Sequence, residues 1–367
     1  MKNFYILLLS IFIFTGCATN QQEISKKSNN TNSYAQTKEQ MTHPTLEQTN
    51  IIKNKENINI DDEDNSYKIA IVFPSKIVGK YAKGAINTMM AYMLHNNIKF
   101  KFEVFDSSTQ DSGNMIDIFN QIKEKKFTNV IALFTAESIN NLFLIKDIDK
   151  INLYLPLINK YEVEETPQNI IYGGMDYKAQ IKTLMTLSNK KNSIFYSNSN
   201  LGLKLKNYVK ESKELVKVTT EITEHNNVFK KIVRNKNLHN SSLFLNTSII
   251  KSSIILSQLR AHGTRPYRIL STQLNYTPLV ISLTQYPDRK NFIIANSIGK
   301  TESKLQESLS LFDADIQYNW VNYSTLIGMD FLYKNDQSTY FPSKIEDNQV
   351  KYNVELYNNT KYSFKKL

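Results

Sequence analysis

Short, continuous apolar runs alternate along most of the chain with stretches whose apolar residues recur at helical spacing. The first run, Tyr67–Phe73, is typical of a strand that is covered on both faces. In the following stretch, 78–93, the apolar residues recur on one face of a helix. The same alternation continues to about residue 295, and it predicts parallel sheets with right-handed crossovers.

The pattern defines more strands than one sheet comfortably holds. The strand-like runs are Tyr67–Phe73, Lys99–Phe105, Asn129–Phe134, Leu153–Ile158, Ser193–Tyr196, Val216–Ile222, Ser242–Leu245, Tyr267–Leu270 and Phe292–Ala295. Helix-like stretches fall at about 112–125, 136–148, 175–189, 200–213, 226–237 and 248–262. We therefore expect two doubly wound, Rossmann-like α/β lobes. A barrel of strand–helix units is the alternative, less favoured because a hairpin is predicted at the end, Val350–Leu356 and Lys361–Phe364.

The first residues have the pattern of an export signal. Lys2 precedes the apolar run Phe4–Phe14, which is shorter than the roughly 20 residues that a membrane-spanning helix needs. The run ends in Phe14-Thr15-Gly16-Cys17, which resembles the bacterial lipobox. The resemblance implies a lipoprotein signal peptide, 1–16, and a mature Cys17 that carries acyl chains such as palmitate and anchors the protein in a membrane. Ala18 after the Cys favours the outer membrane, with the protein facing the periplasm.

Residues 18–66 differ from the rest of the chain. They are rich in Asn, Gln, Thr, Ser, Lys and Glu, and their sparse apolar residues show no period. Such a segment cannot bury enough apolar surface to offset its ordering entropy. We predict that 17–66 is a lipidated, disordered tether.

The composition excludes several classes of chemistry. Cys17 is the single cysteine, so intramolecular disulfides, Cys-rich zinc sites and iron–sulfur clusters are excluded. The five His show no metal-ligand spacing, and no Gly-x-Ser-x-Gly elbow occurs. Gly79 and Gly84 lack the Lys-Ser/Thr that would complete a P-loop. We predict no metal, no cofactor and no enzymatic activity.

The net charge of the chain gives a weaker indication of its binding partners. The net charge is +11, and residues 67–367 hold 39 basic and 26 acidic side chains. A basic globule favours acidic partners such as nucleic acid, anionic headgroups or cell-wall carboxylates, although Lys is also the ordinary solvated surface residue. We predict no nucleic-acid partner, and keep direct binding of peptidoglycan by the basic surface as an alternative.

Several short motifs resemble those of type I periplasmic-binding-protein-like domains, most of all the C-terminal domain of the lipoprotein activators of penicillin-binding proteins. They are Ile69–Ser75 (IAIVFPS), Leu155–Asn159 (LPLIN), Asn169–Gly174 (NIIYGG), Ile269–Thr272 (ILST) with Asn275–Thr277 (NYT), and Leu326–Tyr333 (LIGMDFLY). The resemblance implies a three-strand hinge and a cleft at the carboxyl ends of the strands. Lobe one would comprise 67–172 plus 298–336, and lobe two 173–297 plus 337–367. The resemblance further implies that the protein is an envelope lipoprotein, and that it allosterically regulates a peptidoglycan synthase of the penicillin-binding-protein class.

Four polar residues stand at strand-to-helix junctions that would face the cleft: Ser75, Thr135, Ser138 and Asn198. Helix N-termini expose N–H groups that favour anions, so these four are the candidate ligand-binding residues. Their alternative role is N-capping. Trp320 is interpreted as a core residue.

A small-molecule ligand is the alternative function. The resemblance extends to amino-acid receptors, which have a Gly-x-x-Ser-like loop, a Tyr-Gly pair and an acidic residue in the second lobe. The corresponding segments here are 134–138 without the Gly, Leu201-Gly202 without the Tyr, and Glu224-His225. These departures weaken the case for a solute-binding lipoprotein of an ABC-type transporter with a small amino-acid-like ligand, which remains the second hypothesis.

Overall fold

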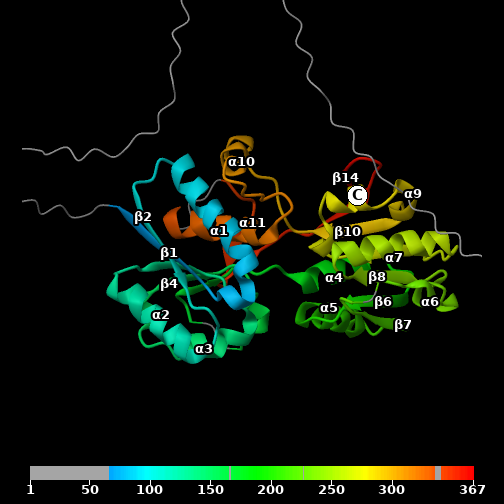
Figure 1. The fold of residues 1–367 in the computed structure, drawn as a ribbon, viewed down its shortest axis with the longest axis horizontal. Coiled ribbons are helices and arrows are strands. Elements are labelled where there is room, and N and C mark those ends of the chain that lie inside the picture. The colour runs from blue at the N-terminus through cyan, green and yellow to red at the C-terminus, as the bar shows by residue number, and fades with distance from the viewer. Residues whose placement is uncertain (1–65, 165–166, 226, 335–339) are drawn as a thin grey trace, which may run out of the picture. The chain divides into compact units, whose positions relative to one another are not determined.

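The computed structural model describes residues 66–164, 167–225, 227–334 and 340–367. Two mixed seven-stranded sheets, with helices on both faces, form two α/β lobes (Figure 1). The predicted two-lobed, doubly wound class is confirmed, and the barrel alternative is wrong. The signal peptide at 1–16, the lipidated Cys17 and the tether up to residue 65 lie outside the described residues and stay predictions.

The first sheet has the strand order β11-β12-β5-β4-β3-β1-β2. Its strands are β1 (Tyr67–Phe73), β2 (Phe100–Asp106), β3 (Asn129–Ala132), β4 (Asn152–Leu155), β5 (Ile170–Tyr172), β11 (Lys344–Glu346) and β12 (Gln349–Lys351). The strands β1 to β5 and β12 are parallel to their neighbours, and β11 is antiparallel to β12.

The second sheet repeats this order as β14-β13-β10-β9-β8-β6-β7. Its strands are β6 (Lys191–Ser197), β7 (Leu215–Ile222), β8 (Ser242–Asn246), β9 (Arg268–Ser271), β10 (Phe292–Asn296), β13 (Glu355–Asn359) and β14 (Phe364–Lys366). The central strands β8 and β10 are buried along their whole length, as parallel strands covered on both faces must be.

Helices cover both faces of each sheet. In the first lobe they are α1 (Ser75–His95), α2 (Ser112–Glu124), α3 (Ile139–Phe143), α10 (Ser303–Ser310) and α11 (Trp320–Lys334). In the second they are α4 (Tyr177–Met185), α5 (Asn200–Glu211), α6 (Lys230–Val233), α7 (Ile249–Ala261), α8 (Leu279–Leu283) and α9 (Tyr286–Arg289). Alternate residues of β1 illustrate the arrangement, since Ile69 and Ile71 pack with α1 and α11 whereas Ala70 and Val72 pack with α2 and α3.

The chain passes between the sheets three times, after β5, after β10 and after β12. The last passage corrects the sequence prediction. The hairpin expected at 350–364 is formed by β13 and β14 alone, and residues 344–351, assigned above to lobe two, belong to the first sheet. The apolar run that begins at Val350 is thus two short strands with a crossing between them. Its periodicity cannot reveal the crossing, because Val350 and Leu356 contact different sheets.

None of the helices in the described residues is both long and apolar enough to cross a lipid bilayer.

Candidate functional site

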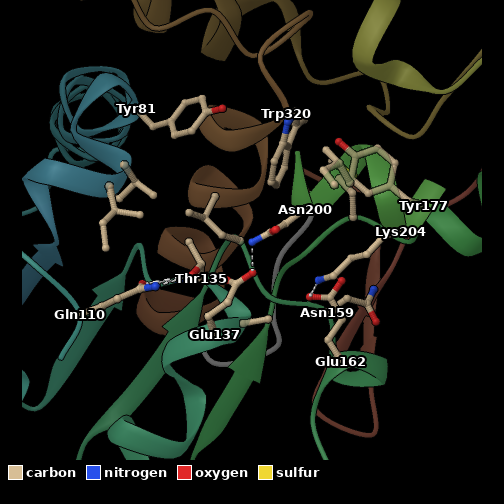
Figure 2. A pocket seen from close by; sticks show the side chains of 16 residues that line it. Tyr81, Gln110, Thr135, Glu137, Asn159, Glu162, Tyr177, Asn200, Lys204 and Trp320 are labelled. Atoms are coloured by element: carbon tan, nitrogen blue, oxygen red, sulfur yellow. Dashed lines mark hydrogen bonds and ion pairs between the residues drawn. The ribbon is translucent and has the colours of Figure 1, made fainter. Parts of the chain in front are cut away.

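A cavity of about 380 Å³ lies where the two lobes meet at the carboxyl ends of the first sheet (Figure 2). The first lobe contributes the start of α1 and the loops after β2, β3 and β4, and the second contributes the first turns of α4 and α5. The position between β1 and β3 is the point where the strand order reverses, and α/β sheets commonly bind ligands at such a point.

Most of the lining is apolar. Aliphatic and thioether side chains contribute to it, together with three aromatic residues that are labelled in Figure 2. The aromatic residues are Tyr81 on α1, Tyr177 on α4 and Trp320 at the start of α11. The Tyr177 and Trp320 rings meet edge to face with centroids 6.4 Å apart, so the two lobes also share an aromatic contact.

Two polar contacts join the lobes across this cavity. The amide Nδ2 of Asn200 on α5 donates to Oε1 of Glu137 in the first lobe at 2.9 Å. One turn further along α5, the ammonium of Lys204 lies 3.0 Å from Oε2 of Glu162. Both are drawn as dashed lines in Figure 2. Together they hold the first turns of α5 against the first lobe.

Gln110 and Thr135, two further polar residues of the cavity, are paired within the first lobe. Gln110 donates from Nε2 to the Thr135 hydroxyl at 2.7 Å, and its Oε1 accepts from the backbone N–H of Thr135 at 3.2 Å. Interaction with the Thr135 side chain lowers the pKa of Glu137, and Asn200 and the charge of Lys204 act in the same direction. Glu137 is therefore ionised at neutral pH.

Of the four predicted site residues, Thr135 alone lines the cavity. Ser138 is buried directly behind it, with its hydroxyl donating to the Thr135 carbonyl at 2.9 Å. Ser75 and Asn198 are exposed and lie outside the cavity lining. The structure thus brings Thr135 and Ser138 together and leaves the other two apart.

The helix N-termini near the cavity are already capped by the protein. The Asp106 carboxylate accepts from the backbone N–H of Ser75 at 3.0 Å, at the start of α1. The Ser199 hydroxyl accepts from Gly202 at 3.1 Å, at the start of α5. An anion would have to displace these acceptors. At each of these two junctions the protein itself thus supplies an acceptor for one helix N–H group.

Sequence reasoning missed the aromatic residues of the site. Trp320 packs on the core as expected, but it also forms one wall of the cavity. Tyr177 is 9% exposed and its hydroxyl has no hydrogen-bond partner, while burial raises its pKa well above the ordinary value. Glu224, suggested by analogy with amino-acid receptors, is exposed and does not line the cavity.

Within the described residues, no group of three or more His, Cys, Asp or Glu side chains gathers where it could hold a metal ion.

No protein-family model matches the chain, and no curated protein matches its sequence. Solved structures do resemble it. A solute-binding protein of an ABC transporter from Rhodopseudomonas palustris, in complex with p-hydroxybenzoic acid, is 11% identical with a TM-score of 0.61 over 83% of this chain and 96% of that chain. A putative branched-chain amino acid ABC transporter protein from Rhodospirillum rubrum is 11% identical with a TM-score of 0.59, over 82% and 100%.

The C-domain of LpoA from Haemophilus influenzae, described as a regulator of PBP1A, is also similar. It is 10% identical with a TM-score of 0.54, over 82% of this chain and 99% of that chain. At this level of identity the likeness establishes the fold, and the predicted type I periplasmic-binding-like architecture is confirmed. Because one fold serves both transport and regulation among these structures, function must be argued from the site.

Proposed function

We propose that this chain is a non-enzymatic envelope lipoprotein that binds a peptidoglycan synthase of the penicillin-binding class and regulates it allosterically. The observation that carries the proposal is the state of the cleft. Its charged and amide side chains are already paired, among them Glu137 with Asn200, Glu162 with Lys204 and Gln110 with Thr135, and the N-termini of α1 and α5 are capped. The carboxylate of an amino acid would therefore have to displace one of these partners to bind Lys204, Asn200 or Gln110.

The Glu137–Asn200 and Glu162–Lys204 contacts join the two lobes across the cleft. This arrangement supports a role in which the joined lobes together form the surface that binds a protein partner. Regulation requires that this surface bind the active form of the synthase more tightly than the inactive form, since only differential affinity shifts a conformational population. The fold shared with a regulator of PBP1A is consistent with this role.

Cys17, lipidated and held in the outer membrane, would place the globular part in the periplasm. A flexible tether of the length of 18–66 would reach about 40 Å as a random coil and further when extended. That reach would allow the globular part to approach a synthase anchored in the opposite membrane.

A reconstitution experiment tests the proposal. The full chain is mixed with a purified penicillin-binding protein from the same cells, and complex formation and transpeptidase rate are measured. We expect co-purification and a higher rate. The Cys17→Ala variant, which cannot be lipidated, should act equally well in detergent solution. Absence of enrichment together with an unchanged rate would refute the proposal.

A second candidate function is solute binding for an ABC-type transporter. The specific observation in its favour is the 380 Å³ cavity, which has the size of ordinary small-molecule pockets. Thermal shift with a panel of amino acids, amides and aromatic acids separates the two candidates. Strong stabilisation by one natural solute, without any effect on a synthase, would favour transport.

A further inference from the structure

More acidic than basic side chains line the cavity. Glu137 and Glu162 are acidic, and Lys204 is the one basic residue among the described lining residues. Lys204 is bound to Glu162 at 3.0 Å, so these two charges balance. Glu137 is left with neutral direct partners, the amide of Asn200 and the side chain of Thr135. The cavity therefore carries a net negative charge.

The aromatic residues reinforce this charge. The faces of Tyr and Trp rings attract cations, by about 0.5–1 kcal/mol where exposed and more where water is excluded. Lys80 already lies over the ring of Tyr81, 4.9 Å from its centroid. In the described part of the chain no Lys or Arg is positioned over the rings of Tyr177 or Trp320, which pack edge to face against one another beside the cavity.

The hydroxyl of Tyr177 is the second independent sign of a ligand. It is buried, without a hydrogen-bond partner, on a residue that lines the cavity. A buried polar group without a partner is unfavourable by about 1–3 kcal/mol. An N–H group of a bound molecule would satisfy this oxygen, which is turned towards Trp320 in the view of Figure 2.

Anions are disfavoured by the same geometry. The N-terminus of α1 is capped by Asp106, that of α2 by Asp111 and that of α5 by Ser199. A carboxylate ligand would find no uncapped helix end among these and would face Glu137.

We propose that the cleft binds a small organic cation, an amine with an apolar or aromatic body, whose charged nitrogen lies between Glu137 and the rings of Tyr177 and Trp320. The apolar and aromatic lining residues would surround its body, namely Ile77, Val78, Tyr81, Ala136, Leu157, Met175, Tyr177, Leu201 and Trp320. This inference goes beyond the proposed function, since such a ligand could either signal to the synthase interface or be a transported solute.

Trp320 is the single Trp of the chain, so its emission reports on this cleft alone. The full chain is titrated with four compounds of similar size and different charge: 2-phenylethylamine, 2-phenylethanol, 3-phenylpropionate and phenylalanine. We expect saturable changes in Trp320 emission with the amine, and binding about tenfold tighter than for the anion or the zwitterion. Tighter binding of the anion or the zwitterion, or no saturation with the amine, would overturn the proposal.

The matched variants are Glu137→Gln and Glu124→Gln. Glutamine at 137 keeps the acceptor for Asn200 and removes the charge, so the preference for the amine over the alcohol should fall about tenfold. Glu124 is exposed on α2, away from the cavity, and its variant should bind as the natural chain does. An unchanged preference in Glu137→Gln would refute the role of Glu137. The assay contains no synthase, so its outcome is independent of the proposed function.

Discussion

At the scale of single residues, Arg289 is the largest fully buried side chain of the described structure, with 2% of its surface exposed. Its guanidinium donates to the carbonyl of Thr284 at 2.6 Å and to the carbonyl of Lys361 at 2.8 Å. It therefore links the end of α8 to the turn of the C-terminal hairpin. Burial lowers the pKa of Arg289, yet both terminal nitrogens donate to backbone carbonyls, whereas Nε has no hydrogen-bond partner.

Replacing this side chain should be strongly destabilising. Arg289→Met leaves buried carbonyls of Thr284 and Lys361 without donors, and we expect the free energy of unfolding in urea to fall by about 3 kcal/mol. Arg265→Met is the control, since Arg265 is exposed in the loop before β9. It should change stability by less than about 1 kcal/mol. Equal losses in both variants would contradict the role assigned to Arg289.

Replacing Tyr172 should not destabilise the protein at neutral pH, in contrast to replacing Arg289. It is fully buried, its hydroxyl has no hydrogen-bond partner, and burial raises its pKa to about 12. The folded state therefore keeps this proton to a higher pH than the unfolded state, whose pKa is near 10. Stability is unaffected below about pH 10 and declines between about pH 10 and 12, by up to about 1.4 kcal/mol for each pH unit.

Tyr172→Phe should be neutral or mildly stabilising at pH 7, because it removes a buried hydroxyl that has no partner. It should also reduce the slope of stability against pH in the alkaline range. Urea unfolding at a series of pH values checks both effects. A loss of stability at pH 7 would indicate a hydrogen bond at this hydroxyl.

At the scale of elements, two glycines of the sequence have different roles. A Cβ at Gly202 would lie 2.0 Å from the backbone oxygen of Ser197, so α5 can pack this closely on the end of β6 only with glycine there. A Cβ at Gly79 would meet nothing closer than Ser75 at 3.7 Å. Gly79 is thus a helix residue without a packing requirement.

The two Ala substitutions should differ accordingly. Gly202→Ala forces α5 outward and should lower the free energy of unfolding by about 2 kcal/mol. Gly79→Ala should raise it, by up to about 1 kcal/mol, because Ala favours the helix. Thermal unfolding of both variants measures the difference. Equal effects would show that the close approach of α5 to Ser197 is not needed.

The elements that sequence predicted best were the long apolar strands, such as β1 and β6. The short strands β5, β11 and β12 carry too few residues to show a period and were not predicted. The helix expected at 136–148 is a short turn followed by α3, and that expected at 226–237 contains only α6 and a 3₁₀ turn. Apolar spacing alone does not distinguish a helix from a loop packed on a sheet.

The sequence predicts only part of the site, because local sequence patterns do not reveal tertiary contacts. Thr135 could be placed because it follows a strand at the switch point of the sheet. Tyr81 lies on α1 and Tyr177 on α4, and neither belongs to a motif that would mark it in the sequence. Only the tertiary fold brings the two residues together at the cavity. Ser75 and Asn198 stand at junctions of the expected type, but no pattern in the sequence reveals that Asp106 and Ser199 provide the caps.

At the scale of the whole molecule, the two lobes are joined by three passages of the chain and by the contacts of α5 across the cleft. The contacts of Asn200 and Lys204 are polar and partly exposed, so each contributes little to folding. We expect them to act instead on the angle between the lobes, because they join the lobes across the cleft.

Removing both contacts tests this effect. In Asn200→Ala/Lys204→Ala we expect the emission of Trp320 to shift to the red, as water enters the cleft, and the radius of gyration from X-ray scattering to increase. The free energy of unfolding should change by less than about 1 kcal/mol. Lys210→Ala, an exposed position on the same helix, is the control and should leave both measurements unchanged. An unaltered Trp320 spectrum in the double variant would disprove the role of these contacts.

The place of β12 in the first sheet also bears on how the protein folds. The backbone N–H of Tyr172 donates to the carbonyl of Asn348 at 2.8 Å, so β5 gains this neighbour only from a segment far along the chain. Contacts between residues that are distant in sequence carry a large loop-closure entropy and slow folding. We therefore expect the edge of the first sheet at β5 to be covered late in folding, after the local strand–helix units have formed.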